Sequence, residues 1–210
     1  MSGDRRHLDA LSSRILAVHE MLDALHVEHQ FGGAIALAWY RSPRATTDVD
    51  VNVTLSPENA EPLLGALGHL GVSVTAEDRA LIERDGQARL DWGGYYLDVF
   101  FATLELHREM AVSARNVAFG PAHIPILSPE HLIVCKAVFD RPKDWVDIEE
   151  IVALGTQVDP ETVLGWIDEL LGEDSVQHER LAHLLVAIDA PASGASGQPI
   201  DGEPPDQPNE

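Results

Sequence analysis

The chain has 210 residues and a net charge of −21, and 45% of its residues are hydrophobic. That length suits one domain of ordinary size, or a core domain with a small appended one. With 14 Lys and Arg against 35 Asp and Glu, little material remains for the basic stripe of an extended nucleic-acid footprint. Small molecules, cationic partners or a metal–nucleotide complex fit the charge better.

Three further features bear on where the protein works. No apolar run is long enough to span a bilayer, and the N-terminus lacks a secretory signal pattern. The single cysteine, Cys135, excludes an internal disulfide framework and reads as a small buried hydrophobe. We therefore predict a cytoplasmic protein without a membrane partner.

Residue patterns in the N-terminal half predict alternating helices and strands. Apolar residues recur at a helical period near the start, and polar and apolar residues alternate around residue 50, as in a half-buried strand. In chain order we predict a helix over 8–25, a strand over 26–31, a short buried helix over 34–40, a strand over 48–55 and a helix over 57–70.

The remaining chain predicts a hairpin and then mainly helices. Two strand-like runs flank Gly93 and Gly94, which is a hairpin signal. The second run is apolar except for Asp98, which indicates a strand covered on both faces. A last strand is predicted over 123–127. The expected organisation is an α/β domain over 1–127, with a small mixed sheet and an N-terminal helix, a helical region over 128–190 and a disordered acidic tail over 191–210.

Three acidic residues interrupt segments that otherwise read as strands. Asp48 and Asp50 lie two residues apart, so their side chains share one face about 6–7 Å apart, and Asp98 lies in the apolar hairpin strand. An unpaired carboxylate there would cost several kcal/mol. Magnesium held by these acids, and completed by phosphates and water, would remove that cost. In the alternative, Asp48 and Asp50 face water on an edge strand and Asp98 pairs with a core arginine.

A Gly-Gly pair precedes the first two acids. Gly32 and Gly33 stand between a predicted strand and a predicted helix, where glycine lets backbone N–H groups approach phosphate oxygens. Alone, such a pair usually marks only a turn. About fifteen residues upstream of a strand-borne D-x-D motif, it is a stronger indication of phosphate binding.

This combination resembles the nucleotidyltransferase superfamily, with its DNA polymerase β-like fold. That superfamily has a Gly-Gly or Gly-Ser turn that opens a helix, D-x-D or D-x-E on the next strand, and a third acid on a neighbouring strand. The form R-x-T-x-D-h-D, where h is apolar, is most similar to AbiEii-type toxins. It is carried by Arg44, Thr46, Asp48 and Asp50. A second motif of that group, K-x4-R-x-K-D-x-x-D, is matched by Lys136, Arg141, Lys143, Asp144 and Asp147. The resemblance covers roughly residues 27–154.

The resemblance implies a catalytic domain over 1–127 that transfers a nucleoside monophosphate from an NTP, such as ATP, to an acceptor. Two Mg²⁺ ions, with Mn²⁺ as a substitute, would be held by Asp48, Asp50 and Asp98. The predicted nucleotide contacts are Gly32, Gly33, Arg44, Thr46, Lys136, Arg141 and Lys143. Asp144 and Asp147 would orient these cations or cap the following helix. The alternative for this last stretch is an ordinary helix start with local ion pairs.

The acceptor stays open at this point. One hypothesis is a toxin that acts on an RNA end, such as that of tRNA, and is restrained by a cognate antitoxin. A second is transfer to a cationic small molecule such as an aminoglycoside, which suits the acidic chain. A third is a non-catalytic binding module on the same fold.

The histidines do not add a metal motif. The chain has ten of them, and none form H-x-x-x-H or H-E-x-x-H. His123, His131 and His178 are predicted to be surface residues or hydrogen-bonded core residues, so no zinc site is predicted.

Overall fold

The computed structural model describes residues 2–189, with side chains described for 10–186. The predicted tail over 191–210 lies outside the described residues. The helices are α1 (Ser2–Ala24), α2 (Gly33–Leu37), α3 (Glu61–His69), α4 (Ala76–Asp85), α5 (Glu105–Val112), α6 (Pro129–Phe139), α7 (Pro142–Ala153), α8 (Pro160–Leu171) and α9 (Val176–Asp189), with a 3-10 turn η1 (Pro57–Asn59). The strands are β1 (His29–Phe31), β2 (Asp48–Val53), β3 (Gln87–Asp91), β4 (Tyr96–Phe101), β5 (Arg115–Phe119) and β6 (Ala122–Ile126).

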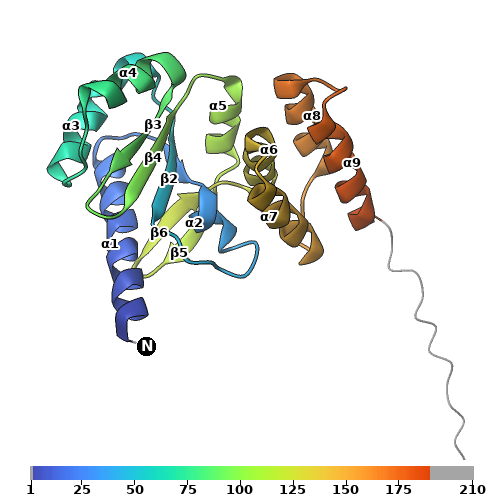
Figure 1. Cartoon of the computed structure of the whole chain (residues 1–210), viewed down its shortest axis with the longest axis horizontal. Coiled ribbons are helices and arrows are strands. Elements are labelled where there is room, and N and C mark those ends of the chain that lie inside the picture. The colour runs from blue at the N-terminus through green and yellow to red at the C-terminus, as the bar shows by residue number, and fades with distance from the viewer. Residues whose placement is uncertain (1, 190–210) are drawn as a thin grey trace, which may run out of the picture.

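The strands form one mixed sheet in the order β3-β4-β2-β1-β6-β5. The pairs β2–β4 and β1–β6 are parallel, and the other three pairs are antiparallel. In Figure 1, α1 lies on one side of the sheet, while α5 and α6 lie on the other. The prediction of an α/β fold with a small mixed sheet and a helical C-terminal region is confirmed.

The two faces of the central strands differ in character. On the side of α1, the strands β2 and β4 bury a continuous apolar layer made of Val49, Val51, Leu97 and Val99. Because side chains alternate along a strand, Asp48, Asp50 and Asp98 lie on the opposite face. That face is only partly covered, since Tyr96 is exposed and Phe100 is half-buried. The prediction that this strand is covered on both faces is therefore wrong, and the open face carries the acids.

Some elements depart from the sequence patterns. The predicted helix over 57–70 is split at Ala60 into η1 and α3. The helices α4 and α5 and the strand β5 were not predicted. β5 is an edge strand whose residues are exposed or half-buried, so it lacks the apolar alternation that marks a buried strand.

The C-terminal helices form the second part of the core. α6 is buried along most of its length, and α8 and α9 pack beside it and α7 through Val163, Ile167, Leu181 and Leu185. The predicted division after residue 127 falls between β6 and α6. Within residues 2–189, no helix is both long enough and apolar enough to cross a membrane.

Candidate active site

The three predicted acids meet on the open face of the sheet. In the parallel pairing of β2 and β4, Asp50 lies directly opposite Asp98, and Asp48 is two residues earlier on β2. The side chains of Asp48 and Asp98 are 34% and 16% exposed. The structure therefore presents a half-buried cluster of three carboxylates from two neighbouring strands, which is a donor set suited to Mg²⁺.

An arginine that the sequence patterns did not single out joins two of these acids. The Arg89 guanidinium donates to Asp48 Oδ1 over 2.7 Å and to Asp98 Oδ2 over 3.2 Å. It also lies over the Tyr96 ring, 4.3 Å from the ring centroid. Arg89 is half-exposed, so this is a surface cation rather than the core arginine of the alternative prediction. The predicted hairpin could have indicated this contact, because a turn at Gly93 and Gly94 pairs residue 89 with residue 98.

Asp50 is the most enclosed of the three acids. Among residues 10–186, no hydrogen bond or ion pair reaches its carboxylate. Burial, followed by the neighbouring charge of Asp48, raises the pKa of Asp50 above the usual range. Burial and the charge of Asp50 raise the pKa of Asp98 to about 6, although Arg89 acts in the opposite direction. Two carboxyls that resist ionisation beside a third are characteristic of a functional site, and a bound cation would relieve the repulsion.

The Gly-Gly pair forms one wall of this cluster. The Gly32 N–H donates to the Asp50 carbonyl over 2.9 Å. Gly33 has φ of +49°, and a Cβ at this position would lie 1.9 Å from Asp50 Oδ2. Only glycine fits there, since a side chain would overlap the carboxylate. The pair thus brings the start of α2 against Asp50, and its contact with phosphate stays a prediction.

The second motif forms a network of charges in which Lys136, Asp144 and Asp147 are buried and Arg141 is exposed. Lys136 on α6 is 5% exposed, and its Nζ donates to Asp147 Oδ2 over 2.7 Å and lies 3.5 Å from Asp144 Oδ1. Arg141 donates to both Asp144 oxygens, over 2.5 and 3.1 Å. Burial alone would raise the pKa of Asp144, but the hydrogen bond from Arg141 and the charge of Lys136 hold it below the usual range. Both aspartates therefore position cations.

Two arginines from the loop before β2 complete the network. Arg41, which the sequence patterns did not single out, lies 2.7 Å from Asp147 Oδ1 and 2.6 Å from Glu150 Oε2. Arg44 lies 3.7 Å from Asp147 Oδ2. Thr46 is placed differently, because its Oγ1 accepts from the Asp48 N–H over 3.0 Å and so fixes the start of β2.

Lys143 is the one predicted cation outside this network. It is exposed on the first turn of α7, and within residues 10–186 it makes no hydrogen bond or ion pair. The structure therefore assembles every charged residue of the two motifs except Lys143 around Asp50 or Asp147.

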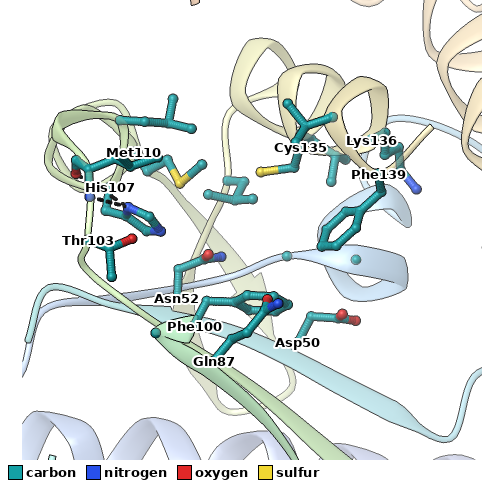
Figure 2. Close-up of a pocket in the computed structure, with 18 of the residues that line it drawn as sticks. Asp50, Asn52, Gln87, Phe100, Thr103, His107, Met110, Cys135, Lys136 and Phe139 are labelled. Carbon is teal, nitrogen blue, oxygen red and sulfur yellow. Dashed lines mark hydrogen bonds between the residues drawn. The ribbon is translucent and has the colours of Figure 1, made fainter. Parts of the chain in front are cut away.

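A pocket of about 310 Å³ opens beside Asp50 (Figure 2). One end is polar, with Gly32, Gly33, Asp50, Lys136 and Arg141. The walls are largely apolar, with Phe100, Phe101, Leu106, Met110, Leu127, Leu132, Val138 and Phe139. Cys135 also lines the pocket. Burial raises the pKa of its thiol to about 12, so the thiol stays protonated and contributes to the pocket wall rather than acting as a nucleophile.

A buried amide faces this pocket. Asn52 lies on β2 beyond Asp50 and is only 7% exposed, yet its side chain has no hydrogen-bond partner among residues 10–186. Figure 2 shows it pointing into the pocket, below His107 and Met110. The Asn52 amide is not one of the fully enclosed unpartnered groups of residues 10–186, so it is open to the pocket and available to a ligand.

A second hollow, also of about 310 Å³, lies on the Asp98 side of the site. It is lined by Asp98 and Arg89 and shares Asp50, Phe100 and Arg141 with the pocket of Figure 2. Asp50 thus borders two adjoining cavities.

Comparison with known proteins supports the fold. No protein-family model matches the chain, and no curated protein sequence matches it. The solution structure of the antibiotic-resistance factor ANT(2″)-Ia is 16% identical and covers 85% of this chain and 91% of its own, with a TM-score of 0.51. The crystal structure of ANT(2″)-Ia in complex with adenylyl-2″-tobramycin gives the same identity and TM-score, over 85% and 97%. This chain has a nucleotidyltransferase-like fold.

A third similar structure is a tRNA nucleotidyltransferase complexed with a primer tRNA and an incoming ATP analog. It is 15% identical and covers 81% of this chain and 60% of its own, with a TM-score of 0.31. A similarity that low adds nothing to the assignment of the fold.

Magnesium affinity should rise with pH up to about pH 6–7 and then level off. The raised pKa values of Asp98 and Asp50 mean that protons must leave before these carboxylates bind a cation. If one proton is displaced, the Kd should fall about tenfold per pH unit below pH 6. Calorimetric titrations with Mg²⁺ between about pH 5 and 8 measure this.

The control is Asp98→Asn, which should bind Mg²⁺ more weakly and with a flatter pH profile. A wild-type affinity that is constant over this range would contradict the prediction.

The stability of the metal-free protein should depend on pH in the opposite sense to its Mg²⁺ affinity. Because the pKa of Asp98 is raised in the folded state to about 6, the free energy of unfolding should fall as pH rises from about 4 to about 6.

Arg89→Gln should bind Mg²⁺ more tightly in the absence of nucleotide, by about threefold to tenfold. The Arg89 ion pairs with Asp48 and Asp98 must break when a metal binds, and exposed pairs are each worth about 0.2–1 kcal/mol. The matched control is Arg79→Gln. It removes an exposed ion pair with Glu61, which is not one of the three clustered acids. Unchanged or weaker affinity in Arg89→Gln would show that Arg89 does not compete with the metal.

Proposed function

We propose that this protein is a metal-dependent nucleotidyltransferase, which transfers a nucleoside monophosphate from an NTP to an acceptor. The observation that carries the proposal is the convergence of Asp48, Asp50 and Asp98 beside the Gly32-Gly33 turn. A cationic network lies on the other side of Asp50, and both elements come from segments far apart in the sequence.

The residues fit a divalent metal. Asp50 has a carboxylate without a hydrogen-bond or ion-pair partner in the described chain, and the Arg89 guanidinium already bridges Asp48 and Asp98 as a cation does. In this proposal the three acids hold two Mg²⁺ or Mn²⁺ ions. When bound, the metal lowers the pKa of the acceptor and offsets the charge of the leaving pyrophosphate.

The two cavities suggest where each substrate binds. The pocket of Figure 2 contains the glycine pair, Lys136 and Arg141 at one end, so we place the triphosphate there and the nucleoside along the apolar walls. The acceptor then enters the hollow beside Asp98. Its oxygen forms the bond to the α-phosphorus, Asp98 takes its proton, and the bond to pyrophosphate breaks on the opposite side.

Two acceptor classes remain within the proposal. An RNA end, with tRNA as one case and a cognate antitoxin as regulator, follows from the AbiEii-like motifs. A compact cationic molecule of the aminoglycoside kind follows from the net charge of −21. The RNA end leads on the strength of the two motifs, and a labelling assay with both acceptors separates the two classes.

Asp50→Asn should abolish transfer, with a loss of at least about a thousandfold, because it removes a metal ligand at the centre of the site. The change is nearly isosteric and removes a charge that burial disfavours, so folding should be retained, as judged by circular dichroism. The assay incubates the protein with each α-labelled NTP, Mg²⁺ or Mn²⁺, and either total RNA or an aminoglycoside mixture. Glu83→Gln, an exposed change on α4, is the matched control.

Each result of that assay has a meaning. Label on RNA from the wild type and Glu83→Gln alone would support the RNA end, and label on the small molecule would support the second class. Full activity in Asp50→Asn would overturn the assignment of the site. Absence of transfer, together with absence of NTP binding in calorimetry, would favour a non-catalytic module.

Asn52→Leu should weaken NTP binding by about tenfold and reduce discrimination between bases. The Asn52 amide faces the pocket without a partner among residues 10–186, and one lost hydrogen bond in a buried setting corresponds to about that factor. Calorimetry with the four NTPs measures both effects. Thr103→Val, at the exposed rim of the same pocket, is the control and should change affinity less. Equal affinities in Asn52→Leu and the wild type would remove Asn52 from the nucleotide site.

A further inference from the structure

A second group of potential metal ligands lies on the opposite face of the sheet from the acids. His19 and Asp23 are one turn apart on α1, and His29 is the first residue of β1. His19 Nδ1 lies 2.9 Å from His29 Nε2, and His19 Nε2 lies 3.5 Å from Asp23 Oδ2. One ligand atom from each residue lies within 4.8 Å of the others. His29 pairs with Val53 across the strands, so its side chain is on the face away from Asp50 and Asn52.

The hydrogen bond of His29 to the backbone orients its ring so that the other nitrogen can bind a metal. Its Nδ1 lies 3.0 Å from the Val27 carbonyl oxygen, so this nitrogen carries the hydrogen and donates it. The Nε2 lone pair then points at His19. A backbone carbonyl that fixes the second nitrogen is the usual outer partner of a metal-binding histidine. Burial lowers the pKa of His29, which favours the neutral ring that metals require.

We propose that His19, Asp23 and His29 bind a divalent transition metal of the Zn²⁺ class. Two imidazoles and one carboxylate select Zn²⁺, Co²⁺ or Ni²⁺ over Mg²⁺, which prefers oxygen ligands and retains water. Metal–nitrogen bonds of about 2.0–2.1 Å in a tetrahedral site separate neighbouring ligand atoms by about 3.3 Å. The present histidine contact of 2.9 Å would therefore widen by a few tenths of an ångström.

The third protein ligand, Asp23, is accessible, and a surface hollow gives a metal ion a path to the site. The Asp23 side chain is 62% exposed, so its rotation toward the histidines meets little resistance. A surface hollow of about 400 Å³ borders Asp23, His26, Glu28 and His29. Solvent in this hollow can supply the fourth ligand, which leaves a site with three protein ligands and one water.

Such a site would join α1 to β1, at the point where the chain enters the sheet. Metal binding to the folded chain would then add to its stability by mass action. This role does not depend on the proposed nucleotidyl transfer, because none of the three residues faces the acids or the pocket of Figure 2. The competing interpretation is a hydrogen-bonded chain from Asp23 through His19 and His29 to Val27, without a metal.

The test uses the full chain without a histidine tag, titrated with Co²⁺ and followed by visible absorption. In the presence of excess Mg²⁺, which fills the proposed carboxylate site, we expect the intense bands of a tetrahedral site to saturate at one Co²⁺ per chain and to disappear when Zn²⁺ is added. Asp23→Asn and His19→Gln should each weaken binding by more than about tenfold. His69→Gln, an exposed histidine on α3, should bind as the wild type does. Asp50→Asn should also keep the bands, which separates this site from the carboxylate cluster.

The same titration is followed by thermal unfolding, where Zn²⁺ should raise the Tm of the wild type and of His69→Gln but not of Asp23→Asn. Because Asp23 is exposed, its variant should fold, and its metal-free Tm checks this. Absence of tetrahedral bands in the wild type, or equal affinity in Asp23→Asn and the wild type, would overturn the proposal in favour of the hydrogen-bonded chain.

Discussion

The parallel pairing of β2 with β4 is the constraint on which the site depends. It places Asp50 opposite Asp98 on a half-buried face, with Asp48 two residues away. Burial of these carboxylates and, after it, their mutual repulsion raise the pKa values of Asp50 and Asp98. The apolar layer on the other face of the same strands compensates for this cost, because Val49, Val51, Leu97 and Val99 hold the pairing in place whatever the charge state. The fold thus keeps an electrostatic strain, which Arg89 offsets in part and which a proton or a bound cation relieves further.

The cations around the site are held by acids in turn. Lys136, Arg41 and Arg44 all meet at Asp147, and Arg141 is fixed by Asp144. Buried ion pairs add little net stability, but they fix side chains in one geometry. In a chain of net charge −21, free lysines and arginines would pair with many acids. Asp144 and Asp147 on α7 pair with these cations and hold Lys136 and Arg141 at the pocket beside Asp50. This accounts for the presence of acids as well as bases in the second motif.

The sequence predicted those parts that depend on local pattern. Alternation identified β2 and its acids, and the Gly93-Gly94 turn was sufficient to pair Arg89 with Asp98, although that pairing was not among the predictions. Contacts between distant segments were not predictable in this way. Arg41 and Asp147 are 106 positions apart, and nothing in either segment indicates the other. In the sequence, Asn52 is simply another polar residue on a strand. Its burial without a hydrogen-bond partner among residues 10–186 becomes apparent only in the fold, where α5 and α6 cover it. His19 and His29 match no zinc motif because one is on a helix and the other on a strand.

Local charge, rather than total charge, decides what can approach Asp98. The net charge of −21 acts over distances at which salt screens it, since the Debye length is about 8 Å at physiological ionic strength. The hollow beside Asp98 is lined by three acids, Asp50, Asp85 and Asp98, and by two arginines, Arg89 and Arg141. In the proposed function, two divalent ions would offset the charge of a triphosphate in the adjoining pocket of Figure 2, and the acids and arginines of the hollow nearly balance one another. The net charge of the whole chain therefore does not decide between the two acceptor classes of the proposed function.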